Sequence, residues 1–217
     1  MAEPNGSTGE QRRLHSVEQL AELVIAASAG RSRFVVGLVG PPGVGKSTVS
    51  GALTSLLDPA PPIVGMDGFH LANQVLVDRG LIDRKGAPDT FDADGFVAIL
   101  ERLRSADTTV WCPRFDRSIE DSIAAAVAVT PADRIVIVEG NYLLLTDAPW
   151  DRVADLLDLA VYLDLAHAAR VGRLIARHIE FGKSETDARR FVEVSDEVNA
   201  AMVAASRSRA GATLTLS

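Results

Sequence analysis

Eight residues near the start of the chain have the types and the spacing of a loop that holds phosphate groups. Residues 40–47 read GPPGVGKS, which fits the pattern G-x-x-x-x-G-K-[ST]. Glycines let backbone N–H groups turn inward around an anion, and Lys46 can reach the oxygens of the terminal phosphates. A turn that only joined a strand to a helix would not need Lys followed by Ser. We expect nucleotide contacts from Gly40, Gly43, Val44, Gly45, Lys46, Ser47 and Thr48.

Three acidic residues stand directly after apolar runs: Asp67 follows IVGM, Glu139 follows IVIV and Asp164 follows VYL. The carboxyl ends of parallel strands meet at one edge of a sheet, so Asp67 and Glu139 should lie near the terminal phosphate. Glu139 is placed to hold Mg²⁺ together with the Ser47 hydroxyl and Asp67, and Asp67 is also placed to accept the proton of an attacking alcohol. A solvated strand end and an Asp-Gly turn are the alternatives for these two acids. Asp164 is expected only to cap the next helix.

The elements that must position these residues are strands that alternate with helices. Helical patterns follow the first strand and precede the third, which implies parallel βαβ units with ligands beyond the carboxyl ends of the strands. The chain should therefore form an α/β, three-layer sandwich of the P-loop NTPase type, with a mainly parallel five-stranded sheet and a helical lid. The final ATLTL could add an edge strand. The five expected strands cover residues 34–40, 63–66, 108–112, 134–140 and 159–164.

Composition narrows the class of protein. The 217 residues are 47% hydrophobic and 24% charged, and 29 acids against 22 bases give a net charge of -7. This charge disfavours a dedicated nucleic-acid binder, and no apolar run is long enough for a membrane span. Residues 1–13 lack the apolar core of a signal peptide and are expected to be a disordered tail before one domain at 14–217. The single cysteine suits a reducing compartment, so we expect a cytoplasmic protein.

Six motifs follow one another along the chain: GPPGVGKS, MDGFH, RKGAPDTFD, PRFDR, VEGNYLLL and RVGRLIARH. In this order they resemble the group of P-loop kinases that contains uridine kinases, phosphoribulokinases and type I pantothenate kinases. The compact bacterial branch, often labelled nucleoside kinases or fructose-transport-system kinases, is the most similar. The resemblance spans roughly residues 34–216. It implies ATP as phosphoryl donor, Mg²⁺ as cofactor and a small hydroxylated metabolite as acceptor, and family precedent leaves a homodimer open.

The basic segment near residue 170 matches the arginine-bearing lid helix of that family, which closes over ATP. Arg170, Arg173 and Arg177 are spaced by three and four residues, so they share one helical face. The resemblance implies that all three contact the nucleotide, with the lid at about 166–190. It also implies catalytic roles for Arg173, Lys46 and the base Asp67. A solvated basic face is the alternative for the arginines.

The same resemblance implies an acceptor pocket. Asp67 matches the family's catalytic acid, Asp92 an acid that contacts acceptor hydroxyls, and Asn199 an asparagine that touches the acceptor in pantothenate kinases. Phe115 and Asp116 match the tyrosine and acid of a P-x-Y-D pattern. A histidine of the uridine kinases is replaced here by Glu120, which departs from strict pyrimidine-nucleoside specificity. The expected acceptor wall is Asp67, Phe69, His70, Arg84, Lys85, Asp92, Phe115, Asp116, Glu139 and Asn199.

Two classes of function remain after the motifs are read together. The first is a metabolite kinase whose acceptor is a nucleoside, a pantothenate-like acid or a sugar. Basic residues near the pocket, Arg84, Lys85, Arg114 and Arg117, would tolerate an anionic acceptor. The second is a regulatory P-loop NTPase that acts on a protein partner. The sequence has no N-K-x-D motif for reading guanine, which weighs against the second class.

Overall fold

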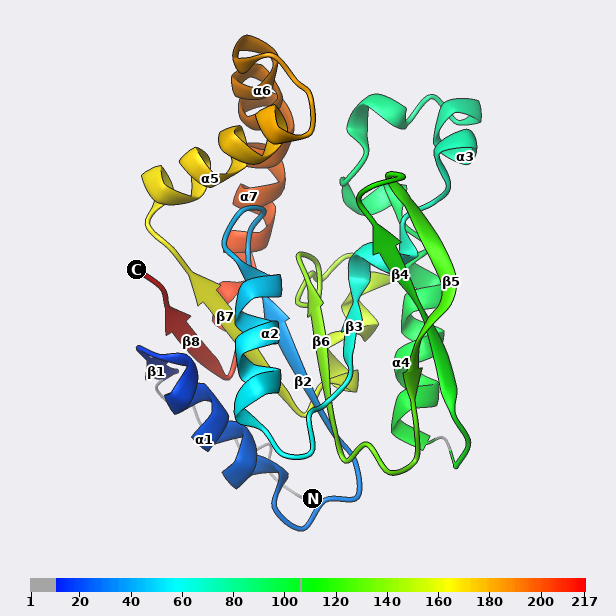
Figure 1. The fold of residues 1–217 in the computed structure, drawn as a ribbon, viewed down its shortest axis with the longest axis vertical. Coiled ribbons are helices and arrows are strands. Elements are labelled where there is room, and N and C mark those ends of the chain that lie inside the picture. Colours follow the sequence, from blue (N-terminus) through cyan, green and yellow to red (C-terminus); the bar gives the residue numbers. More distant parts are fainter. Residues whose placement is uncertain (1–10, 106) are drawn as a thin grey trace, which may run out of the picture.

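The computed structural model describes residues 11–105 and 107–217 of the chain. Six parallel strands form one sheet in the order β1-β8-β7-β2-β6-β3, which Figure 1 shows with helices on both faces. The strands are β1 (Arg12–Leu14), β2 (Phe34–Val39), β3 (Ile63–Gly65), β6 (Ile135–Gly140), β7 (Leu159–Asp164) and β8 (Ala212–Thr215).

The side chains of β2 alternate between two apolar cores, which makes the three layers. Val35 and Val39 belong to the core that includes Phe96 of α4, whereas Val36 and Leu38 belong to a second core with residues of α1 and α2. A strand buried on both faces reads as a continuous apolar run, as β2 does. The three-layer, mainly parallel α/β architecture predicted from the sequence is therefore confirmed. The helices are α1 (Val17–Ser28), α2 (Lys46–Leu56), α3 (Asn73–Asp78), α4 (Ala93–Ser105), α5 (His167–Glu180), α6 (Glu185–Phe191) and α7 (Glu197–Ala205).

The strands of the sheet differ in part from the five expected ones. Residues 108–112 do not enter it: β4 (Val110–Asp116) pairs with β5 (Asp121–Val129) in a separate antiparallel hairpin. The last strand, β8, lies between β7 and β1 and is not at an edge. Residues 12 and 13 of the predicted tail form the edge strand β1 together with Leu14, and residues 1–10 of that tail lie outside the described part of the chain.

The register of the sheet brings the expected site residues to one edge. Glu139 of β6 is level with Leu38 near the end of β2 and with Gly65 at the end of β3. The phosphate loop follows β2, and Asp67 comes two residues after β3. All three features therefore lie at the carboxyl edge of the sheet, where ligands of parallel α/β proteins bind.

Two segments stand above this edge on opposite sides. Figure 1 shows α5 and α6 on one side, and α3 with the tips of β4 and β5 on the other. A π-helix, Val192–Asp196, joins α6 to α7. Asp164 does not cap α5 as expected, because it pairs with Arg207 at 2.9 Å, and the cap residue Ala166 makes no side-chain bond. In the described residues, no helix is long and apolar enough to cross a membrane.

Candidate active site

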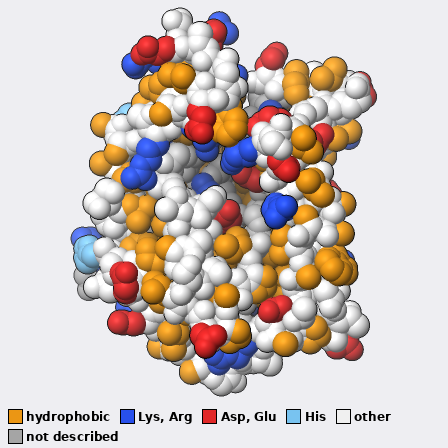
Figure 2. Space-filling view, viewed as in Figure 1, with side chains coloured by type: hydrophobic (Ala, Val, Ile, Leu, Met, Phe, Trp, Pro, Cys, Tyr) orange, Lys and Arg blue, Asp and Glu red, His pale blue; other side chains and the backbone are white. Residues whose placement is uncertain are grey.

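A cavity of about 820 Å³ opens at the carboxyl edge of the sheet. It is hollowed between the phosphate loop, the segment after β3, the β4–β5 turn and the helices α5 and α6, and basic and acidic side chains gather at its rim in Figure 2. The sequence-predicted residues that line it are Gly43, Gly45, Lys46, Ser47, Thr48, Asp67, His70, Lys85, Phe115, Arg117, Glu139, Arg173, Arg177 and Asn199.

The phosphate loop has a backbone that only glycine adopts easily at two positions. Gly43 has φ +79° and Gly45 has φ +99°, and a Cβ on Gly43 would come within 2.6 Å of the Leu174 side chain. Gly45 is also the N-cap residue of α2, and it has no side chain that could accept a hydrogen bond from the first N–H groups of the helix. These N–H groups and the positive end of the helix face the cavity mouth as an anion-binding cradle.

Lys46 is held beside this cradle by neutral oxygens. Its Nζ donates to the carbonyl of Gly40 at 2.9 Å, to that of Pro41 at 3.4 Å, and to Oδ1 of Asn141. Burial lowers the pKa of Lys46 to about 8, although the negative charges of Asp67 and Glu139 act against that shift. No carboxylate is among these hydrogen-bond acceptors, so the charge of Lys46 is available to an anion in the cradle.

Glu139 lies next to the start of α2 and accepts two hydroxyl hydrogen bonds. Ser47 donates to its Oε1 at 3.1 Å, and Ser50 donates to its Oε2 at 3.3 Å. Burial raises the pKa of this carboxyl, and Lys46 opposes the shift. In the described residues, no group of three or more His, Cys, Asp or Glu side chains could hold a metal. One carboxylate with one hydroxyl suits Mg²⁺, which is usually bound by few protein oxygens together with substrate phosphates.

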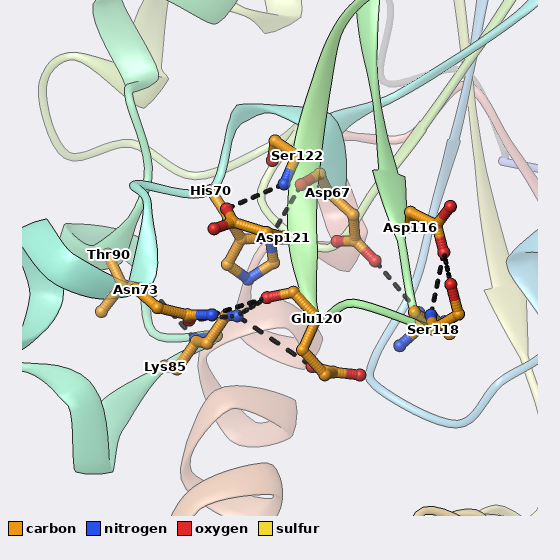
Figure 3. A network of polar contacts seen from close by, with 12 residues as sticks. Asp67, His70, Asn73, Lys85, Thr90, Asp116, Ser118, Glu120, Asp121 and Ser122 are labelled. Carbon is orange, nitrogen blue, oxygen red and sulfur yellow. Dashed lines mark hydrogen bonds and ion pairs between the residues drawn. The ribbon is translucent and has the colours of Figure 1, made fainter.

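Asp67 lies in a short 3-10 helix, Met66–Phe69, and its side chain is 41% exposed to the cavity. Its Oδ2 accepts a hydrogen bond from Arg117 Nη2 at 3.2 Å. His70 Nδ1 donates to the Asp67 carbonyl at 2.8 Å, because a carbonyl can only accept, and Figure 3 shows the imidazole beside this acid. Burial lowers the pKa of His70, against the attraction of Asp67. A carboxylate thus faces the cavity from the sheet edge.

An aromatic and basic wall continues from His70. Its ring lies 4.0 Å from that of Phe91 and 4.9 Å from that of Phe115, measured between centroids. Lys85 Nζ lies 5.0 Å from the centre of the Phe115 ring and donates to the carbonyl of Glu120 at 2.6 Å. Such a wall offers both an apolar face and charged donors to a bound molecule.

The lid arginines separate into two groups. Arg173 and Arg177 line the cavity, and Arg173 Nη1 is 3.5 Å from where a Cβ on Gly45 would lie. Arg170 is buried and does not line the cavity: it donates to the Pro42 carbonyl at 3.2 Å and pairs with Glu197. A nucleotide contact by Arg170 stays a prediction, since in the structure this guanidinium ties α5 to the phosphate loop and to α7.

Other predicted acceptor residues also lie outside the cavity. Asp92 caps α4, because its Oδ1 accepts from Gly95 N–H at 2.9 Å. Asp116 Oδ1 accepts from the N–H and hydroxyl of Ser118 at 2.9 and 2.6 Å, which shapes the β4–β5 turn. Phe69 is buried in the core, 5.0 Å from the ring of Phe96. Both acids have a turn or capping role and Phe69 a core position, so none of the three lines the cavity, and their contact with an acceptor stays a prediction.

The positions of the remaining predicted residues explain why they do not line the cavity. Arg84 forms an exposed ion pair with Asp89 at 3.1 Å. Val44 is fully buried in the apolar core beneath the loop, and Gly40 contributes only the carbonyl that holds Lys46. Arg114 is exposed on β4 and does not line the cavity.

Several cavity residues were not singled out by the sequence. Asn141 follows Glu139 by two residues, so the same rule of polar residues after a buried strand could have found it. His178 and Asp196 also line the cavity, and His178 Nε2 lies 2.8 Å from Asp196 Oδ2. They come from α5 and from the π-helix, whose position depends on tertiary packing and gives no local sequence pattern.

Comparison with known proteins places this geometry among small-molecule kinases. Residues 35–203 match the family described as Phosphoribulokinase / Uridine kinase. A Schizosaccharomyces pombe protein provisionally named a uridine kinase is 33% identical over 183 residues, which are 79% of this chain and 77% of that protein. A pantothenate kinase of Corynebacterium diphtheriae is 31% identical over 153 residues, which are 68% of this chain and 49% of that enzyme. A crystal structure from Silicibacter sp. TM1040, provisionally named a fructose transport system kinase, has a TM-score of 0.85 and 36% identity, covering 91% of this chain and 98% of that chain.

Proposed function

The chain belongs to the phosphoribulokinase/uridine kinase family, and we propose from this premise that it transfers the γ-phosphate of ATP to a hydroxyl group of a small metabolite. Membership makes it a phosphotransferase that acts on a small molecule. The names of its relatives leave nucleosides, pantothenate-like acids and sugars as the acceptor classes. The residues of the cavity support a division of labour between donor and acceptor.

The observation that carries the proposal is the placement of Asp67 in the same cavity as the phosphate cradle and Lys46. Asp67 would take the proton of the acceptor hydroxyl while the oxygen of that hydroxyl bonds to the γ-phosphorus. The bond from this phosphorus to the bridging oxygen of ADP breaks in the same transfer. Lys46 and Arg173 would face the charge on the phosphate oxygens, since both border the cradle.

The residues around Glu139 fit Mg²⁺. The Ser47 hydroxyl and the Glu139 carboxylate would hold the ion, which when bound neutralises phosphate charge. Burial raises the pKa of Glu139 in the absence of a cation, and a bound cation would favour its charged form. The helices α5 and α6, in the predicted lid at 166–190, would help to exclude water from the transfer.

The experiment that tests this function is ADP release from MgATP against a panel of pantothenate, uridine, cytidine, fructose, ribose and other hydroxylated metabolites. We expect turnover that depends on one acceptor and that Lys46→Ala and Asp67→Asn each reduce strongly. Turnover that no small acceptor changes, but that a protein partner stimulates, would instead indicate a regulatory NTPase. Near-normal turnover by Asp67→Asn would show that this carboxylate is not the base.

A further inference from the structure

The carboxylate proposed as the base is already paired with a cation. Arg117 Nη2 donates to Asp67 Oδ2 at 3.2 Å, and both side chains are partly exposed in the cavity, at 45% and 41%. The guanidinium takes up one acceptor position of Oδ2, while Oδ1 has no hydrogen-bond partner within residues 11–105 and 107–217. The pair therefore leaves Oδ1 open to an acceptor hydroxyl and holds the Arg117 guanidinium beside the base.

The turn that carries Arg117 is fixed by its own hydrogen bonds. Asp116 and Ser118 are the two residues that flank Arg117. Asp116 Oδ1 accepts hydrogen bonds from the N–H and the hydroxyl of Ser118, as Figure 3 shows. Asp116 therefore closes the turn around Arg117 and sets the direction in which the chain presents it. This geometry places the guanidinium at the cavity beside the base.

A second set of contacts holds the far end of the same turn. Lys85 Nζ donates to the Glu120 carbonyl at 2.6 Å and to Asn73 Oδ1 at 2.7 Å, and Asn73 Nδ2 donates to the same carbonyl at 3.0 Å. Glu120 has φ +52°, a left-handed conformation that costs free energy in a residue with a side chain. Lys85 is thus occupied in anchoring the turn, whereas the Arg117 guanidinium on the same side of the cavity is paired only with Asp67 among the described residues.

A second guanidinium faces the cavity from the opposite side. Arg177 of α5 lines the cavity, and within residues 11–105 and 107–217 its side chain forms no hydrogen bond or ion pair. Burial lowers the pKa of Arg177 and repulsion by the charge of Arg117 adds to this effect, while attraction by Asp196, Asp67 and Glu120 opposes it. Two guanidiniums that repel each other across a cavity form a place where an anion would be stabilised by both.

We propose that the acceptor carries an anionic oxygen group, a carboxylate or a phosphate, which binds between Arg117 and Arg177 and replaces the Asp67 carboxylate as the partner of Arg117. This inference rests on the proposed kinase function and narrows its acceptor to an anionic hydroxy compound. Arg117 is then the residue that selects the charge of the acceptor, because its guanidinium exchanges the Asp67 carboxylate for the anionic group of the acceptor. A neutral acceptor would leave the Arg117–Asp67 pair in place.

The test compares acceptors that differ in one anionic group: D-glycerate with glycerol, pantothenate with pantothenyl alcohol, and ribose 5-phosphate with ribose. The first two pairs probe a carboxylate and the third a phosphate. Arg117→Gln removes the charge, Arg117→Lys keeps it without the planar fork, and Arg114→Gln is the matched control on the exposed part of the same hairpin. The measured quantities are kcat and KM from ADP release.

For wild type we expect turnover of one anionic member and much weaker turnover of its neutral partner. Arg117→Gln should raise KM for the anionic member by about tenfold or more relative to Arg114→Gln, with Arg117→Lys between them. KM for the neutral member should change little. The inference is overturned if the neutral members are the better acceptors, if Arg117→Gln affects both members equally, or if it behaves like Arg114→Gln.

A binding measurement separates this inference from the proposed function. The anionic compounds are titrated by calorimetry into the enzyme loaded with a non-hydrolysable ATP analogue. Binding that Arg117→Gln weakens, without turnover of any acceptor by wild type, would reject the kinase function and retain the anion site. Absence of binding by every anionic compound would reject the site.

Discussion

The structure and the family resemblance assign different roles to the buried arginine of α5, and a substitution at this residue tests which role is correct. Arg170 pairs with Glu197 and donates to the Pro42 carbonyl of the phosphate loop, whereas the resemblance implies a nucleotide contact. Arg170→Met keeps much of the side-chain volume but removes the charge. Breaking a buried ion pair costs about 3–5 kcal/mol. The cost should be lower here, because Glu197 is 30% exposed and keeps the hydrogen bond with His167. We therefore expect a loss of about 2–3 kcal/mol in the free energy of unfolding.

The assay is urea unfolding followed by tryptophan fluorescence, in which the buried Trp150 should report the loss of packing and the exposed Trp111 should change less. A double-mutant cycle with Glu197→Met should show that the two losses are not additive, with a coupling of about 1–3 kcal/mol. Arg189→Met is the matched control, because Arg189 and Glu185 form an exposed pair on one helix, 63% and 66% exposed. This control should cost less than about 0.5 kcal/mol.

The coupling should also depend on pH in a stated direction. Burial acts to raise the pKa of Glu197, but hydrogen bonds from Arg170 and His167 outweigh it, so the pKa lies below its usual value of 4.5. A lowered folded-state pKa contributes stability that is present above about pH 4.5 and is lost as the pH falls through the folded value. The coupling free energy between Arg170 and Glu197 should therefore fall toward zero as the pH drops below about 4.5. If Arg170→Met is as stable as Arg189→Met and only weakens ATP binding, the structural role assigned to Arg170 is refuted.

Two further predictions concern the phosphate loop and the hairpin. Burial lowers the pKa of Lys46 to about 8, and bound phosphates should raise this pKa again. ATP binding should therefore take up protons above about pH 8 and weaken as the pH rises further. Calorimetry in two buffers of different ionisation enthalpy measures the proton uptake, which Lys46→Arg should abolish. Gly68→Ala should destabilise the protein by about 1–3 kcal/mol, because its Cβ would lie 2.6 Å from the Pro113 carbonyl oxygen of β4. Gly51→Ala in α2, where a Cβ meets nothing within 4 Å, is the control and should stabilise by up to about 1 kcal/mol. Equal unfolding midpoints for both alanine variants, or proton uptake that Lys46→Arg retains, would contradict these expectations.

The donor half of the cavity could be predicted from the sequence because its parts are local. A strand, a glycine-rich loop and a helix follow one another around Lys46, and each strand delivers the residue at its end to the same edge. Glu139 lies level with Gly65 for this reason. Contacts between residues that are near in sequence leave a pattern that a single chain displays.

The hairpin could not be predicted in the same way. Val110 and Cys112 are buried while Trp111 is 56% exposed, which is the one-sided alternation of an antiparallel strand. In a stretch of five residues this alternation is easily read as a continuous apolar run. The alanine-rich β5 gives no strand signal, since alanine is depleted in strands, so the partner that would have identified the hairpin was missed.

Helical spacing was also insufficient for the lid. Arg170, Arg173 and Arg177 occupy one broad face of α5, as their spacing predicts, but that face is wide enough to border two environments. Its N-terminal part packs on Pro42 and Glu197, and its later turns reach the cavity. Periodicity reports the direction of a side chain around the helix axis and says nothing of what lies opposite each turn.

The same contrast explains why the reaction is easier to infer than the acceptor. The phosphate cradle needs one loop and the start of one helix, whereas the acceptor side combines Asp67 after β3, Arg117 from the hairpin turn and Arg177 from α5. Each of these depends on the packing of a different element. A substitution in the turn can therefore change the charge presented to the acceptor while the cradle around Lys46 stays intact. If Arg117 selects the acceptor as proposed, the turn between β4 and β5 sets specificity, and the loop after β2 sets the chemistry.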